Sequence, residues 1–179
     1  LADNWDWIVF QQGSRDSGIA STYDNLPKLI AYVKDRVTNP NVRFAFNMTW
    51  AYAQHSNNPC FDNYGRSQQT MYNGIVAAVQ AKVCSIPDIG VIVPNGTAVQ
   101  NARTSFVGDA LTRDDCDHMT LDFGRYIAGL TFVSALTGIC VDAIPYAPNS
   151  LSDRRIAVAK ESVKNALTNP FAVSSLAFK

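Results

Sequence analysis

The chain has 179 residues, of which 47% are hydrophobic, and its 15 basic and 15 acidic side chains give a formal net charge of zero. This length and composition predict one globular domain over residues 1–179 and exclude a disordered chain. No cluster of Lys and Arg is present, which argues against a nucleic-acid partner. The uncharged stretch from Tyr126 to Val141 is shorter than the roughly 20 residues of a transmembrane helix, so no membrane span is predicted.

Short apolar runs alternate with helical periodicity along the chain. Buried parallel strands have short apolar runs or alternating apolar residues, which predicts strands at residues 7–10, 43–50 and 89–93. Apolar residues that recur every three or four positions predict helices at residues 26–37, 67–83, 97–106, 120–137 and 152–168. Strands that alternate with helices favour right-handed crossovers and a parallel sheet. The predicted fold class is therefore α/β.

Ligands of parallel α/β sheets bind beyond the carboxyl ends of the strands. A polar loop at residues 112–118 follows the third predicted strand and contains His118, three residues after Asp115. A carboxylate at this spacing can accept the Nδ1 proton of the imidazole and leave the other ring nitrogen free as a base. The spacing alone is weak evidence, because exposed His and Asp side chains often form only a solvated ion pair. The place of the loop in the chain strengthens the hypothesis of a catalytic pair.

Two aromatic residues and the four cysteines each allow two interpretations. Trp50 ends the second predicted strand and Tyr52 follows it, so they either form a surface for sugar stacking or belong to the core. The four cysteines show no C-x-x-C spacing and the chain has two histidines, which argues against a zinc site. The cysteines are compatible with two disulfides or with free thiols.

Several segments in order resemble one bacterial branch of the SGNH (GDSL-type) esterases and lipases. They are Trp5–Ser14, Met48–Gln54, Pro94–Arg103, the Asp115-x-x-His118 motif and His118–Gly129. The branch is DUF4886, a family of unknown function, and the resemblance spans roughly Trp5 to Gly138. It implies a three-layer sandwich with a flavodoxin-like parallel sheet, and hydrolysis of an ester without a metal or cofactor.

The resemblance also implies roles for individual residues. His118 would be the general base, and Asp115 would orient its imidazole. Donors at the end of the first predicted strand would hold the oxyanion. Apart from the resemblance, the place of Trp50 at the end of the second predicted strand makes it a candidate for substrate contact. The candidates for the oxyanion site are Gln11, Gln12 and Gly13.

The nucleophile block of such enzymes, G-D-S or G-N-S after a first strand, has no match before Trp5. The sequence therefore predicts a serine upstream of Leu1 and a sheet that lacks its first strands. In that case residues 7–10 have an unpaired edge. Ser14 and Ser17 are the alternative nucleophiles, because Ser14 follows Gly13 and Asp16-Ser17 imitates the block.

The sequence thus favours an ester hydrolase that removes an acyl group from a carbohydrate, with a small-molecule or polysaccharide ester as partner and an undetermined oligomeric state. The rival hypotheses are a non-catalytic carbohydrate-binding or structural protein on the same scaffold, and a different α/β hydrolase that uses Ser14 or Ser17. Cys60 and Cys116 both lie in loops at the carboxyl edge, which predicts a disulfide and an extracytoplasmic, periplasmic or secreted setting.

Overall fold

The computed structural model describes residues 3–178, so the expectation that concerns Leu1 lies outside the described residues. Three parallel strands form one sheet in the order β1 (Trp7–Gln11), β2 (Arg43–Asn47) and β3 (Ile89–Val93). The α-helices are α1 (Leu26–Lys34), α2 (Gln68–Lys82), α3 (Asn95–Arg103), α4 (Phe123–Thr137) and α5 (Asp153–Thr168). Short 3-10 helices are η1 (Ser14–Asp16), η2 (Ala20–Tyr23), η3 (Pro59–Tyr64) and η4 (Val141–Ala143). The predicted α/β class is confirmed.

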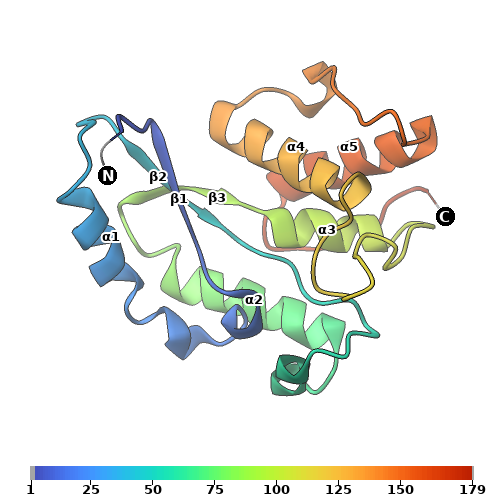
Figure 1. Cartoon of the computed structure of the whole chain (residues 1–179), viewed down its shortest axis with the longest axis horizontal. Helices are drawn as coiled ribbons and strands as arrows, with labels where there is room; N and C mark the ends of the chain where they lie inside the picture. Colours follow the sequence, from blue (N-terminus) through green and yellow to red (C-terminus); the bar gives the residue numbers. More distant parts are fainter. Residues whose placement is uncertain (1–2, 179) are drawn as a thin grey trace.

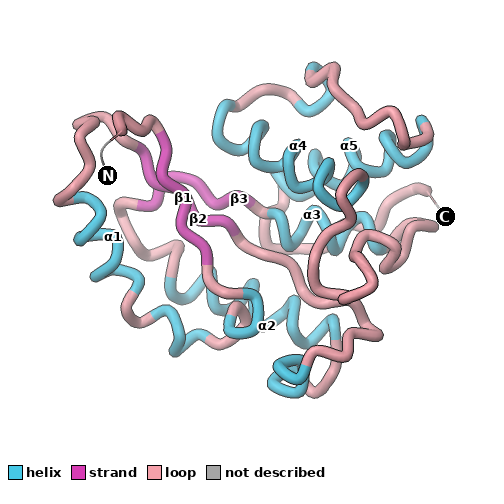
Figure 2. Tube along the Cα trace, in the orientation of Figure 1, coloured by secondary structure: helices cyan, strands magenta, loops and turns pink. Residues whose placement is uncertain are grey.

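The helices lie on two sides of the sheet (Figures 1 and 2). Phe44 and Phe46 of β2 point into one buried cluster together with residues of α1 and α2. A second cluster joins α3, α4 and α5, and α4 contacts β3. Because alternate residues of a strand face opposite sides, the two clusters give a layered α/β fold with helices on both faces.

The strands end together at one edge of the sheet. Gln11 lies opposite Asn47, and Asn47 lies opposite Val93. β2 ends at Asn47 and not at Trp50, so the predicted second strand was three residues too long. Trp50 packs against the α3–α5 cluster, whereas Phe44 and Phe46 belong to the other one. The carboxyl edge therefore begins at Gln11, Asn47 and Val93.

The first strand has one free edge within residues 3–178. β1 pairs with β2 in parallel, and β2 also pairs with β3, so β1 is an outer strand. The prediction of an unpaired edge at residues 7–10 is thereby confirmed. No helix in the described part of the chain is long and apolar enough to span a bilayer.

Candidate active site

The loop that contains His118 is closed at its base by backbone hydrogen bonds. The Arg113 amide donates to the His118 carbonyl at 2.8 Å, and the Thr120 amide donates to the Leu111 carbonyl at 2.9 Å. Gly124 of α4 lies against this base, because a Cβ atom there would be 2.5 Å from the Leu111 oxygen. The first turn of α4 and the loop base therefore pack in direct contact.

Asp117 anchors the loop to the segment that follows β2. Its carboxylate accepts hydrogen bonds from Ser56 Oγ at 2.8 Å and from Asn58 Nδ2 at 2.6 Å. Trp50 Nε1 donates to the Asp117 carbonyl at 2.8 Å, and the Ala53 amide donates to the Cys116 carbonyl at 2.9 Å. These contacts hold the loop beside the chain that leaves β2; in Figure 1 the loop, in yellow, lies below α3 next to the teal chain that follows β2.

Asp115 and His118 are brought together as the sequence predicted. Asp115 Oδ2 lies 2.9 Å from His118 Nδ1. Asp115 Oδ1 accepts hydrogen bonds from the backbone amides of His118 and Asp117, at 2.9 and 3.1 Å. The His118 side chain is 74% exposed and that of Asp115 is 42% exposed. His118 Nε2 forms no hydrogen bond within residues 3–178, which leaves this nitrogen open to a solvent or substrate proton.

The pKa of Asp115 falls to about 2 from its usual value of 3.8. The largest cause is the hydrogen bond from the His118 backbone amide, followed by the one from the Asp117 amide. Hydrogen bonds to the charged form of a carboxylate stabilise that form. Asp115 therefore remains ionised over the whole neutral range, as a residue that orients an imidazole must.

The three predicted oxyanion donors differ in which of their N–H groups are already hydrogen-bonded. Gln12 Nε2 donates to the carbonyl and hydroxyl oxygens of Thr22, at 3.0 and 2.9 Å. The Gly13 amide donates to Gln12 Oε1 at 2.8 Å. Gln11 is exposed at the end of β1, and its Nε2 has no hydrogen-bond partner within residues 3–178. Within residues 3–178 the side-chain amide of Gln11 therefore keeps an uncommitted donor, whereas that of Gln12 does not.

Neither alternative nucleophile is hydrogen-bonded to His118 in the described part of the chain. Ser17 is fully buried, and its hydroxyl donates to the Ser14 carbonyl at 2.7 Å. The Ser14 hydroxyl lies 3.3 Å from the hydroxyl of Tyr52, a side chain that is only 1% exposed. Burial raises the pKa of Tyr52, so this phenol stays neutral and cannot activate Ser14 as a base.

The predicted disulfide between Cys60 and Cys116 is wrong, because both residues are free thiols, as are Cys84 and Cys140. Cys116 has a positive φ of 61°, and its buried Sγ lies 3.5 Å from the Asp114 carbonyl of its own loop. Cys60 lies in the first turn of η3, where its amide donates to Asn58 Oδ1. Asp117, not a disulfide, joins the two loops. The extracytoplasmic setting stays a prediction and loses its support from the cysteines.

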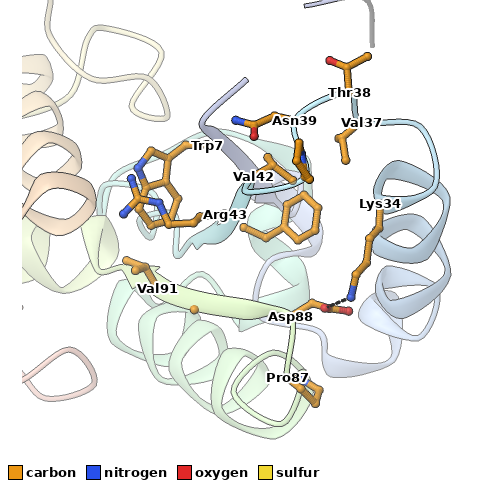
Figure 3. Close-up of a pocket in the computed structure, with 13 residues that line it drawn as sticks. Trp7, Lys34, Val37, Thr38, Asn39, Val42, Arg43, Pro87, Asp88 and Val91 are labelled. Carbon is orange, nitrogen blue, oxygen red and sulfur yellow. Dashed lines mark hydrogen bonds and ion pairs between the residues drawn. The ribbon is translucent and has the colours of Figure 1, made fainter. Parts of the chain in front are cut away.

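A cavity of about 730 Å³ opens at the opposite, amino-terminal edge of the sheet (Figure 3). The Arg43 guanidinium stacks 4.0 Å from the centre of the Trp7 ring there, and Lys34 pairs with Asp88. Neither His118 nor Gln11 lines this cavity, so it is separate from the candidate site. Residues 3–178 contain no cluster of His, Cys, Asp or Glu that could hold a metal ion.

Sequence reasoning missed Asp117, Ser56 and Asn58. These residues position the loop that contains His118, although none belongs to the Asp-x-x-His spacing. The available signal was the second carboxylate next to His118, in a loop expected to meet the segment after β2. Trp50 was predicted to bind substrate, and its half-buried indole donates its N–H to the loop.

The sequence profile of DUF4886, described as a domain of unknown function, matches residues 1–166. The chain belongs to DUF4886. It is similar to a DUF4886 family protein from Bacteroides uniformis ATCC 8492 whose crystal structure is known, with 39% identity and a TM-score of 0.92. The similarity covers 98% of this chain and 67% of that protein. No curated protein matches the chain.

Proposed function

We propose that this DUF4886 protein is an ester hydrolase in which His118 is the general base and Asp115 orients it. The observation that carries the proposal is the 2.9 Å contact between Asp115 Oδ2 and His118 Nδ1, with Nε2 left free. An imidazole held in this way accepts a proton at Nε2 while its Nδ1–H is fixed by the carboxylate. The free nitrogen is therefore the atom that would activate a nucleophile.

In the proposed reaction a serine hydroxyl attacks the ester carbonyl as its proton passes to His118 Nε2. The tetrahedral intermediate then expels the alcohol, which takes the proton from the imidazolium. The acyl group is now bound to the serine oxygen. Water, deprotonated by the same nitrogen, attacks this acyl-enzyme, and the serine oxygen leaves with the proton as the carboxylic acid is released. Asp115 stays ionised throughout and stabilises the imidazolium that forms, in keeping with its low pKa.

The nucleophile in this proposal is a serine outside the described residues. Two contacts support that choice: Ser17 donates its hydroxyl to a backbone carbonyl, and Ser14 lies beside Tyr52. The edge of β1 that no strand within residues 3–178 pairs with adds support, because a strand that precedes the serine could pair there. The substrate class is an acyl ester of a carbohydrate, proposed from the SGNH resemblance of the sequence.

Kinetics of the full protein on p-nitrophenyl acetate test the proposal. His118→Ala should lower kcat/KM by at least about a thousandfold, because the other parts of such a site leave only residual catalysis. Asp114→Ala changes an exposed carboxylate in the same loop and is the matched control, expected to keep the wild-type rate. A His118→Ala rate near that of wild type would refute the role, and a protein without esterase activity would favour the carbohydrate-binding alternative.

A further inference from the structure

A row of three amide side chains crosses the carboxyl edge of the sheet. Gln11 ends β1, Asn47 ends β2 directly opposite it, and Asn95 begins α3 just after β3. Asn95 Nδ2 donates to Asn47 Oδ1 at 2.7 Å, and Asn47 Nδ2 donates to Gln11 Oε1. Asn95 and Asn47 are buried, with 0% and 3% exposure, whereas Gln11 is exposed. The amides thus form a head-to-tail chain from the core to the surface.

The direction of this chain decides which end of Gln11 faces outward. Asn95 Oδ1 is buried and has no hydrogen-bond partner within residues 3–178. Reversing all three amides would put the N–H groups of Asn95 at that unpartnered position. Buried N–H groups without a partner are rarer in proteins than buried carbonyl oxygens without one. The observed direction is therefore the favourable one, and it turns Gln11 Oε1 inward and Gln11 Nε2 outward.

We propose that Asn47 and Asn95 are positioning residues that hold the Gln11 amide with Nε2 outward, as a donor to the carbonyl oxygen of the ester. The inference rests on the proposed function for the identity of the acceptor. The Gln12 side-chain amide donates to Thr22 and the Gly13 backbone amide donates to Gln12 Oε1, so the side-chain donor that remains for this role is Gln11 Nε2. Amides linked in series polarise one another, and a donor fixed before the reaction stabilises the developing oxyanion without reorganisation.

The positioning role predicts a rigid Gln11 side chain although it is exposed. In the full protein labelled with 15N-glutamine, relaxation of the side-chain NH2 groups measures this rigidity directly, and Gln11→Glu identifies the signal by its loss. Asn47→Ala removes the group that holds Gln11. The Gln11 order parameter should then fall from the rigid range to below about 0.6, while that of Gln12, which binds Thr22, stays unchanged.

A mobile Gln11 amide in the wild-type protein would overturn the proposal, as would one equally rigid in Asn47→Ala. Should Asn47→Ala fail to fold, Asn95→Ala provides the second variant, because it removes the donor that orients Asn47. Its expected result is the same loss of order at Gln11, and unchanged order would again overturn the proposal. These measurements do not depend on esterase activity.

Kinetics on p-nitrophenyl acetate then test the acceptor. Gln11→Glu keeps the oxygen that accepts from Asn47 and replaces the outward donor with an oxygen, so kcat should fall about a hundredfold with a small change in KM. Asn47→Ala should lower kcat about tenfold. An unchanged kcat in an active enzyme would refute the donor role of Gln11. A wild-type protein without activity, combined with a rigid Gln11, would refute the proposed function and keep the positioning role.

Discussion

Replacing Asp117 by Ala should weaken the attachment of the His118 loop to the segment after β2. The carboxylate accepts two hydrogen bonds, from Ser56 Oγ and Asn58 Nδ2 at 2.8 and 2.6 Å, and the variant loses both. The contacts of Trp50 Nε1 and the Ala53 amide remain, because they use backbone carbonyl oxygens. Asp117→Ala therefore weakens the attachment of the loop without removing all of it.

The size of this effect follows from the two contacts. A hydrogen bond to a charged group contributes about 1.5–3 kcal/mol to stability, and Asp117 is half-buried, so water replaces part of what is lost. We expect Asp117→Ala to lower the free energy of unfolding by about 2–3 kcal/mol. For a domain of this length that corresponds to a decrease in Tm of about 5–10 °C. Asp117→Asn retains an acceptor oxygen and should lose about half as much.

Thermal unfolding followed by circular dichroism at neutral pH measures the effect. Asp114→Ala is the matched control, because it removes an exposed carboxylate from the same loop and should change stability by less than about 0.5 kcal/mol. Asp117→Ala should also lower the esterase rate more than Asp114→Ala does. Equal Tm values for the two alanine variants would refute the reasoning that Asp117 anchors the loop.

The ionisation of Asp115 and the packing of Gly124 give two further predictions. Because the folded pKa of Asp115 is lowered to about 2 from 3.8, its contribution to stability is complete above about pH 4 and is lost as the pH falls toward 2. A carboxyl titration by NMR should place its midpoint near 2, and a midpoint near 3.8 would contradict the loop geometry. Gly124→Ala should destabilise the protein by about 1–3 kcal/mol, because its Cβ would lie 2.5 Å from the Leu111 oxygen. Gly129→Ala, an exposed site on the same helix with nothing within 4 Å, should gain about 0.5–1 kcal/mol in chemical denaturation, and equal effects at the two glycines would contradict the packing.

Elements with a strong local pattern were predictable from the sequence. β1, β3 and the bodies of α2 and α5 follow from apolar runs and helical spacing, and the structure places them within a residue or two of the predicted positions. The end of β2 was not predictable in this way. Met48 keeps the alternation of Phe44 and Phe46, but its amide donates to Val93 and its carbonyl accepts from Gly96. Pairing with the turn into α3 ends the strand, and that pairing is a tertiary contact.

In the candidate site, too, the local contact was predictable from the sequence and the long-range contacts were not. The Asp115–His118 pair was found because both residues lie in one short loop, where spacing alone fixes the contact. The anchor at Asp117 joins it to Ser56 and Asn58, about sixty residues away in the sequence, and no periodicity reports such a contact. The expected Cys60–Cys116 bond failed for that reason, because a shared sheet edge does not imply that two thiols meet.

The amide row could have been noticed from the sequence, although not its direction. Gln11 and Asn95 follow the ends of predicted strands, and Asn47 interrupts the apolar residues of the predicted strand at residues 43–50. Parallel strands in register bring such positions together at one edge. Which amide donates to which depends on the burial of Asn95 and on the free edge beyond Gln11, and these are properties of the fold.

Whether His118 activates a serine can be measured by labelling the full protein with a fluorophosphonate and mapping the adduct by mass spectrometry. Such reagents react with a serine that a neighbouring base has activated. We expect one modified serine in the wild-type protein, located outside residues 3–178, and loss of that adduct in His118→Ala but not in Asp114→Ala. An adduct that persists in His118→Ala, or no adduct in the wild-type protein, would contradict the claim.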